Sequence, residues 1–167
     1  MIRPATEQDC RALGVIYCLS WKEAYKNIIS DGYLDSLTIE NCTPRKINPT
    51  DNLVAEDNEN IIGVVSFGKG RDESTINEGE LRAIYVLQDF WSKGFGKILF
   101  SSAAKKLEES GFVKFYLWVL KDNYRARRFY EKMGMLNTNV ERWINIGGRN
   151  IDEIKYEFYF KNEYKFV

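Results

Sequence analysis

Residues 88–97, which read QDFWSKGFGK, are the sharpest local signal in the sequence. They follow the β-branched run ELRAIYV (80–86) and precede apolar residues at helical spacing. Gly94 and Gly96 let the backbone turn its amides outward at a helix N-terminus, where the amides attract a phosphate or pyrophosphate. The residues after Gly96 match neither a Rossmann fingerprint nor a Walker loop. Two glycines alone are also typical of a helix start that binds nothing.

Upstream of this stretch, the chain predicts helices followed by strands. Apolar residues recur every three or four positions over 6–27, which predicts one long helix, and Ser30 is placed to cap a shorter one. Two prolines make 41–52 a connector. Three β-branched runs separated by polar turns then predict an antiparallel meander over 52–56, 61–67 and 80–86.

Downstream of the glycine turn, the pattern predicts a helix, a strand, a second helix and a hairpin. These elements cover 94–110, 115–120, 123–132 and 140–160. Gly147 and Gly148 occupy the hairpin turn. The order of elements predicts a single α/β domain over residues 1–167, with a mixed sheet and helices on its faces.

Composition excludes several classes of protein. The chain has no histidine, so sites that need imidazole as a base or ligand are excluded and we expect no metal. Lys+Arg and Asp+Glu both number 24, so no global positive field favours nucleic acid or an anionic membrane. Three cysteines without C-x-x-C spacing, no signal-like N-terminus and no long apolar run predict a cytoplasmic protein without a membrane partner.

Three features around the glycine turn carry a family resemblance. Glu80 opens the preceding strand, the glycines follow as Gly94 and Gly96, and an Asn-x-x-Ala-x-x-x-Tyr pattern runs from Asn123 to Tyr130. With these features in this order, the chain from residue 2 to about 160 resembles the GNAT family of N-acetyltransferases. The resemblance implies a central, mostly antiparallel sheet with a splay, and acetyl-CoA as co-substrate.

The resemblance also implies which residues bind acetyl-CoA. We expect the pantetheine arm alongside Tyr85, Val86 and Leu87, one of whose amides faces the thioester oxygen, with Asn123 as a further contact. The turn residues expected at the pyrophosphate are Trp91, Ser92, Lys93, Gly94, Phe95, Gly96 and Lys97. Trp91 stands where the family usually has arginine or glutamine, which removes one side-chain contact and leaves the backbone contacts.

Acetyl transfer to an amine needs a proton donor for the departing thiolate and a base for the amine. Tyr130 lies about two helical turns after Asn123, on the same side of the expected helix, and the resemblance makes it the general acid. Core packing is the alternative for Tyr130. Glu80 resembles the family's base glutamate, with water as the other base, and strand alternation predicts that it shares a face with Arg82 and Ile84. A solvated or lysine-paired strand-end carboxylate is the alternative for Glu80.

The acceptor side is less defined by the sequence. Trp21 and Tyr25 lie one helical turn apart, as core residues often do, and the resemblance also makes them acceptor contacts. Asp72, Glu73 and Glu78 precede Glu80, either as a solvated loop or as an attraction for a cationic amine.

The expected function is therefore acetyl-CoA-dependent N-acetylation of a primary amine, first of all in a small molecule. A protein N-terminus or lysine is the alternative acceptor. A non-catalytic acyl-CoA-binding module is the alternative from another class, and a homodimer is left open.

Overall fold

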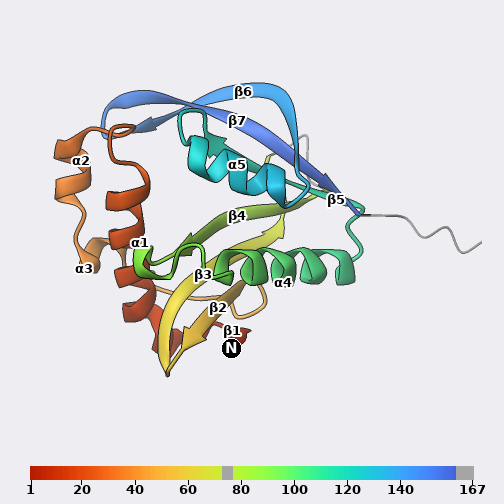
Figure 1. Cartoon of the computed structure of the whole chain (residues 1–167), viewed down its shortest axis with the longest axis horizontal. Coiled ribbons are helices and arrows are strands. Elements are labelled where there is room, and N and C mark those ends of the chain that lie inside the picture. Colours follow the sequence, from red (N-terminus) through yellow and green to blue (C-terminus); the bar gives the residue numbers. More distant parts are fainter. Residues whose placement is uncertain (73–76, 161–167) are drawn as a thin grey trace, which may run out of the picture.

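A computed structural model describes residues 1–72 and 77–160. A seven-stranded sheet in the order β1-β2-β3-β4-β5-β7-β6 runs through its centre (Figure 1). The strands are β1 (Ile2–Pro4), β2 (Asn52–Asp57), β3 (Asn60–Lys69), β4 (Gly79–Val86), β5 (Lys114–Leu120), β6 (Leu136–Ile146) and β7 (Arg149–Tyr159). The helices are α1 (Cys10–Ala24), α2 (Asp31–Ser36), α3 (Ile39–Cys42), α4 (Phe95–Glu109) and α5 (Tyr124–Lys132). Two 3-10 turns, η1 (Glu7–Asp9) and η3 (Gln88–Phe90), precede α1 and α4.

Most of the predicted elements are confirmed. Strands β2, β3 and β4 form the antiparallel meander, and β6 and β7 form the hairpin. The first helix is shorter than predicted: η1 precedes it, and Asn27 beyond its end has a left-handed φ of 66°. The first residues of the connector predicted over 41–52 belong to α3. Strand β1 was not predicted, because three residues are too few to show a period.

Helices cover both faces of the sheet, as predicted (Figure 1). On one face, α4 and α5 pack through Leu99, Phe100 and Tyr130 against the largest hydrophobic cluster. On the other face, α1 packs through Leu13 and Ile16. No helix within the described ranges is both long and apolar enough to span a membrane.

The sheet splays open between β4 and β5. These strands are parallel, and within the described residues their pairing consists of Gly79 with Phe115 and Glu80 with Tyr116. Beyond Glu80, β4 stays paired with β3 alone. The predicted splay is therefore present, and it leaves one edge of β4 without a partner strand.

One prediction about β4 is wrong. The register with β3 shifts between Leu81 and Ala83, which inserts a bulge into the strand. Leu81 and Ile84 consequently pack in the same hydrophobic cluster, although strict alternation would separate them. Glu80 therefore does not share a face with Ile84. It lies on the opposite face, where Tyr85 packs towards α1.

Candidate active site

The glycine turn exposes backbone amides at the start of α4. Ser92 has a φ of 61°, and Gly94, the N-cap residue of α4, has a φ of 90°. No side chain in the described structure caps this helix. The first-turn amides are therefore available to a ligand, and the helix dipole favours an anion there.

A cavity of about 490 Å³ opens beside the turn, between β4 and α5. It brings together eight of the predicted site residues: Tyr85, Val86, Trp91, Ser92, Gly94, Gly96, Lys97 and Tyr130. It is also lined by four cationic side chains: Lys97, Arg125, Arg128 and Lys132. No aspartate or glutamate of the described ranges lines it. Because the whole chain has a net charge of zero, this lining is a local concentration of positive charge suited to an anion.

The remaining predicted cofactor contacts lie outside the cavity lining. Asn123 is buried and caps α5, its Oδ1 accepting from the amide of Ala126 at 3.1 Å. The Lys93 ammonium lies over the ring of Phe90, and Phe95 packs edge-on against the same ring. These contacts stabilise the glycine turn and the start of α5. The sequence pattern alone did not predict them.

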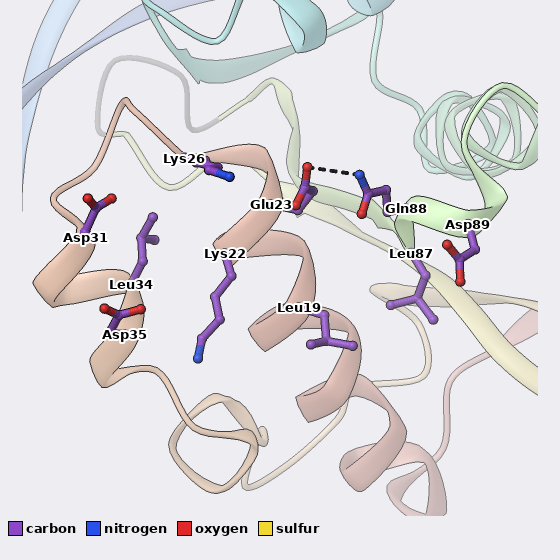
Figure 2. Close-up of a pocket in the computed structure, with 10 residues that line it drawn as sticks. All are labelled: Leu19, Lys22, Glu23, Lys26, Asp31, Leu34, Asp35, Leu87, Gln88 and Asp89. Carbon is purple, nitrogen blue, oxygen red and sulfur yellow. Dashed lines mark hydrogen bonds between the residues drawn. The ribbon is translucent and has the colours of Figure 1, made fainter.

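Leu87 faces a different cavity. This second cavity, of about 610 Å³, lies over α1 beside α2 and the segment after β4 (Figure 2). Its charges are mixed, because Lys22 and Lys26 share it with four carboxylates. Glu23 accepts a hydrogen bond from Gln88 at 3.0 Å across its edge. It contains neither the glycine turn nor Tyr130, so the smaller cavity is the candidate active site.

Of the amides of Tyr85, Val86 and Leu87, one faces the splay. The amide of Leu87 donates to the carbonyl of Ile62 in β3 at 2.9 Å, so it is already used. Backbone groups alternate along an antiparallel strand, so the amide of Val86 faces the opposite side, where β5 has diverged. The Val86 carbonyl accepts from Nε1 of Trp91 at 2.7 Å.

A cationic side chain also stacks on the ring of Trp91. The guanidinium of Arg125 lies 3.5 Å from the ring centroid. Sequence reasoning missed Arg125, because it lies one helix and one strand downstream of the turn and no local pattern connects it with Trp91. Desolvation beside the ring lowers the pKa of Arg125.

Tyr130 is buried at the inner end of the cavity. Its side chain is 8% exposed and packs beside Phe129, so the core alternative describes its ring correctly. Its hydroxyl has no hydrogen-bond partner among the described residues. Burial, and to a smaller extent Tyr85, raise the pKa of Tyr130, so the hydroxyl keeps its proton at neutral pH.

Two further tyrosines connect the end of α1 with this cavity. The hydroxyls of Tyr25, at the end of α1, and Tyr85, on β4, lie 3.1 Å apart. Trp21 packs edge-on against Tyr25, with ring centroids 4.9 Å apart. Burial is the main cause that raises the pKa of Tyr25 to about 12 and that of Tyr85 well above 10.

Glu80 is held in an ion pair outside the cavity. Arg71 donates to both carboxylate oxygens, from Nη2 at 2.6 Å and from Nε at 2.9 Å, while Glu80 is 3% exposed. The backbone amide of Arg71 also approaches the Tyr116 hydroxyl, at 3.2 Å. Glu80 is therefore paired with an arginine, whereas the alternative expected a lysine. A direct contact between Glu80 and an amine requires this ion pair to open.

The other acidic residues before Glu80 are also engaged. Asp72 accepts from Nε1 of Trp118 at 2.9 Å and pairs with Arg142 at 3.2 Å. Glu78 pairs with Lys114 at 2.9 Å, and Glu73 lies outside the described residues. Within the described ranges, no group of acidic residues and cysteines has the arrangement of a metal site.

The hairpin tip closes over the cluster that contains Trp21 and Tyr25. Gly147 and Gly148 have φ values of 58° and 79°, as a tight glycine turn requires. A Cβ on Gly147 would lie 2.7 Å from the ring of Tyr33 in α2, so the tip rests on that ring. Trp21, Tyr25 and Ile146 belong to the same small hydrophobic cluster beneath it.

Comparisons of the sequence match this chain to known proteins. Residues 13–135 match the model of the acetyltransferase (GNAT) family. The uncharacterized N-acetyltransferase YuaI of Bacillus subtilis is 31% identical over 127 residues, which are 73% of this chain and 72% of the relative. Spermidine N(1)-acetyltransferase of Thermoplasma acidophilum is 26% identical over 165 residues, which are 93% of this chain and 97% of the relative.

A solved structure has the same fold. The crystal structure of PaiA N-acetyltransferase from Thermoplasma acidophilum, in complex with coenzyme A, superposes with a TM-score of 0.75. The match covers 96% of this chain and 98% of that one, at 23% sequence identity.

Proposed function

The chain belongs to the acetyltransferase (GNAT) family, and we propose that it transfers the acetyl group of acetyl-CoA to a primary amine of a small molecule. The enzyme class follows from the family: the protein is an acyltransferase with acetyl-CoA as co-substrate. The observation that carries the proposal is the cavity in which exposed helix amides, four cations and Tyr130 meet. We further propose a cytoplasmic enzyme, because its three cysteines are free.

The cavity fits acetyl-CoA, which supplies a thioester at the end of a long arm and a polyanion at the other end. The amides of Gly96 and its neighbours, together with Lys97, suit the pyrophosphate. The open edge of β4 suits the amide-bearing arm, because a splayed strand leaves backbone groups to be paired. Asn123 then contributes indirectly, by capping the helix that carries Tyr130.

Val86 is the residue of β4 that we propose for stabilising the oxyanion. Its amide faces the gap, whereas the amide of Leu87 is bonded to β3. A donor fixed in a strand needs no reorganisation when negative charge develops, which makes it effective in catalysis. Of the three amides expected from the sequence, the hydrogen bonding favours this one.

Tyr130 is the proposed general acid. Its hydroxyl lines the cavity and has no competing partner within the described chain, so it can donate to a departing sulfur. The raised pKa keeps the donor proton in place across the pH range in which the amine is neutral. Tyr130 and Tyr85 line the same cavity, which connects the proposed acid with the proposed acceptor side.

For the base, we propose Glu80 acting through water. The carboxylate lies on the sheet face of Tyr85 and is buried, but Arg71 holds both of its oxygens. A water relay removes the amine proton without opening that pair. If Glu80→Gln has a wild-type rate at every pH, solvent alone is the base.

The closed hairpin supports a small acceptor. Its tip rests on Tyr33, and Trp21 and Tyr25 pack beneath it, so a folded polypeptide has little room to approach. The name of the Thermoplasma relative suggests polyamines as the first acceptors to test. Aromatic walls suit a cationic amine, because ring faces attract ammonium groups.

The test is an amine-library assay in which release of the CoA thiol is measured. Polyamines, amino acids and amino sugars form one arm, and peptides with a free N-terminus or lysine form the other. We expect turnover in the small-amine arm. Turnover with peptides alone would replace the acceptor class, whereas tight CoA binding without turnover in either arm would favour the non-catalytic module.

A further inference from the structure

The contact between Arg125 and Trp91 joins the two walls of the candidate active site. Trp91 belongs to the glycine turn, and Arg125 belongs to the first turn of α5. The guanidinium lies 3.5 Å from the ring centroid, which is within the range of a strong cation–π contact. Both residues line the 490 Å³ cavity together with Gly94 and Gly96.

The ring is fixed in place before any ligand binds. Its Nε1 donates to the Val86 carbonyl at 2.7 Å, which ties the turn to the end of β4. A planar guanidinium stacks on such a ring and keeps its N–H groups free at the edges. Trp91 therefore acts as a platform that presents Arg125 to the cavity.

Arg125 has no anionic partner of its own. In the part of the chain that the structure describes, no carboxylate lies within ion-pair distance of it, and its N–H groups have no acceptor. The charge of Glu23 acts to raise the pKa of Arg125, but its carboxylate accepts a hydrogen bond from Gln88 and forms no ion pair with Arg125 within the described residues. By contrast, Arg127 on the same helix is engaged by the Tyr156 hydroxyl and the Lys121 carbonyl.

We propose that Arg125, held on Trp91, is the side-chain ligand that binds the pyrophosphate of CoA from the wall opposite the glycine turn. The inference rests on the proposed function. The amides at the start of α4 approach the anion from one side, and the stacked guanidinium approaches it from the other. Five N–H donors in a fixed plane suit two adjacent phosphate groups, which a single ammonium does not match. Trp91 is thus a positioning residue for Arg125.

The test compares two ligands by calorimetry: CoA, and acetyl-pantetheine, which lacks the pyrophosphate. Arg125→Met keeps an unbranched side chain that packs on the ring and removes the charge. We expect it to weaken CoA binding about tenfold and to leave acetyl-pantetheine binding unchanged, because a hydrogen bond to a charged group has roughly this value. Arg125→Lys, which keeps the charge without the planar fork, should recover part of the CoA affinity.

Two further variants isolate the stack from general electrostatics. Trp91→Leu removes the platform but keeps Arg125, and we expect a smaller loss, specific to CoA. Lys105→Met removes one charge from a side chain that is 75% exposed on α4 and does not line the cavity, so CoA affinity should stay at the wild-type value.

The outcomes separate the two proposals. Wild-type protein that fails to bind CoA contradicts the proposed function itself. Wild-type protein that binds CoA, with Arg125→Met binding it equally well, overturns only the role of Arg125. An equal loss for CoA and acetyl-pantetheine also overturns it, because Arg125 would then shape the cavity and not bind the pyrophosphate.

Discussion

The proposed cofactor side and the proposed acceptor side of this site are built in opposite ways. The cofactor side is an open cavity with four cations and exposed helix amides, assembled around the glycine turn. The acceptor side is a closed apolar cluster in which Trp21, Tyr25 and Ile146 come from opposite ends of the chain. In the proposed function, the second kind of site selects the acceptor, because its long-range packing can change without disturbing the turn.

Tyr130 lies where the two sides meet, so its loss should have the largest effect. Tyr130→Phe preserves the ring beside Phe129 and removes the hydroxyl. We expect CoA affinity close to the wild-type value and a single-turnover rate lowered by roughly 10² to 10⁴, the usual range for a general acid. A wild-type single-turnover rate in this variant would identify water as the proton donor.

Gly94→Val should damage the cofactor side alone. The residue has a φ of 90°, which a β-branched side chain adopts only with strain, so the turn cannot keep its shape. We expect CoA affinity at least about tenfold weaker by calorimetry. Gly111→Val is the matched control, because Gly111 ends the same helix with a φ of 86° and open space around it. Equal CoA affinity in the two variants would mean that the turn does not bind the cofactor.

Gly147→Ala should damage the acceptor side alone. The new Cβ would meet the Tyr33 ring at 2.7 Å and displace the hairpin tip, whereas Gly148→Ala meets nothing within 4 Å at a similar φ. We expect the KM for the amine to rise about threefold or more in Gly147→Ala compared with Gly148→Ala, with CoA affinity unchanged in both. Identical steady-state constants in the two variants would remove the hairpin tip from the acceptor site.

The smallest effect is expected in the pH profile, where kcat/KM should not fall at high pH. The pKa of Tyr25 is raised to about 12 and the pKa values of Tyr85 and Tyr130 are raised as well, so all three stay protonated as the pH increases. We expect kcat/KM to rise with deprotonation of the amine and to show no falling limb below about pH 11. A falling limb near pH 10 would indicate that Tyr130 titrates as an ordinary phenol.

The cofactor side was largely predictable from the sequence, because its information is local. The glycines of the turn are read within one helix start, and the meander is read from short-range alternation. Local patterns do not contain strand register. The bulge at Leu81–Ala83 was therefore not predicted from the sequence, and the predicted face of Glu80 was wrong.

The acceptor side was not predictable to the same degree, because its contacts join distant segments. Tyr33 meets Gly147 only after α2 and the β6–β7 hairpin have folded onto the same face. Arg71 reaches Glu80, and Arg125 reaches Trp91, through tertiary packing that no spacing rule describes. Aromatic spacing predicted that Trp21 and Tyr25 form one strip, which their ring contact confirms, but it did not predict what covers them.

The splay between β4 and β5 has a consequence for folding. Within the described ranges, only two residue pairs between β4 and β5 connect one half of the sheet with the other. A ligand lying along β4 completes the sheet, so it should slow amide hydrogen exchange on both sides of the gap and make unfolding more cooperative. At a ligand concentration of 100 times its Kd, the gain in stability is about 2.7 kcal/mol. In the proposed binding mode, the fraction of this protein that is folded is thereby coupled to the supply of the acetyl donor.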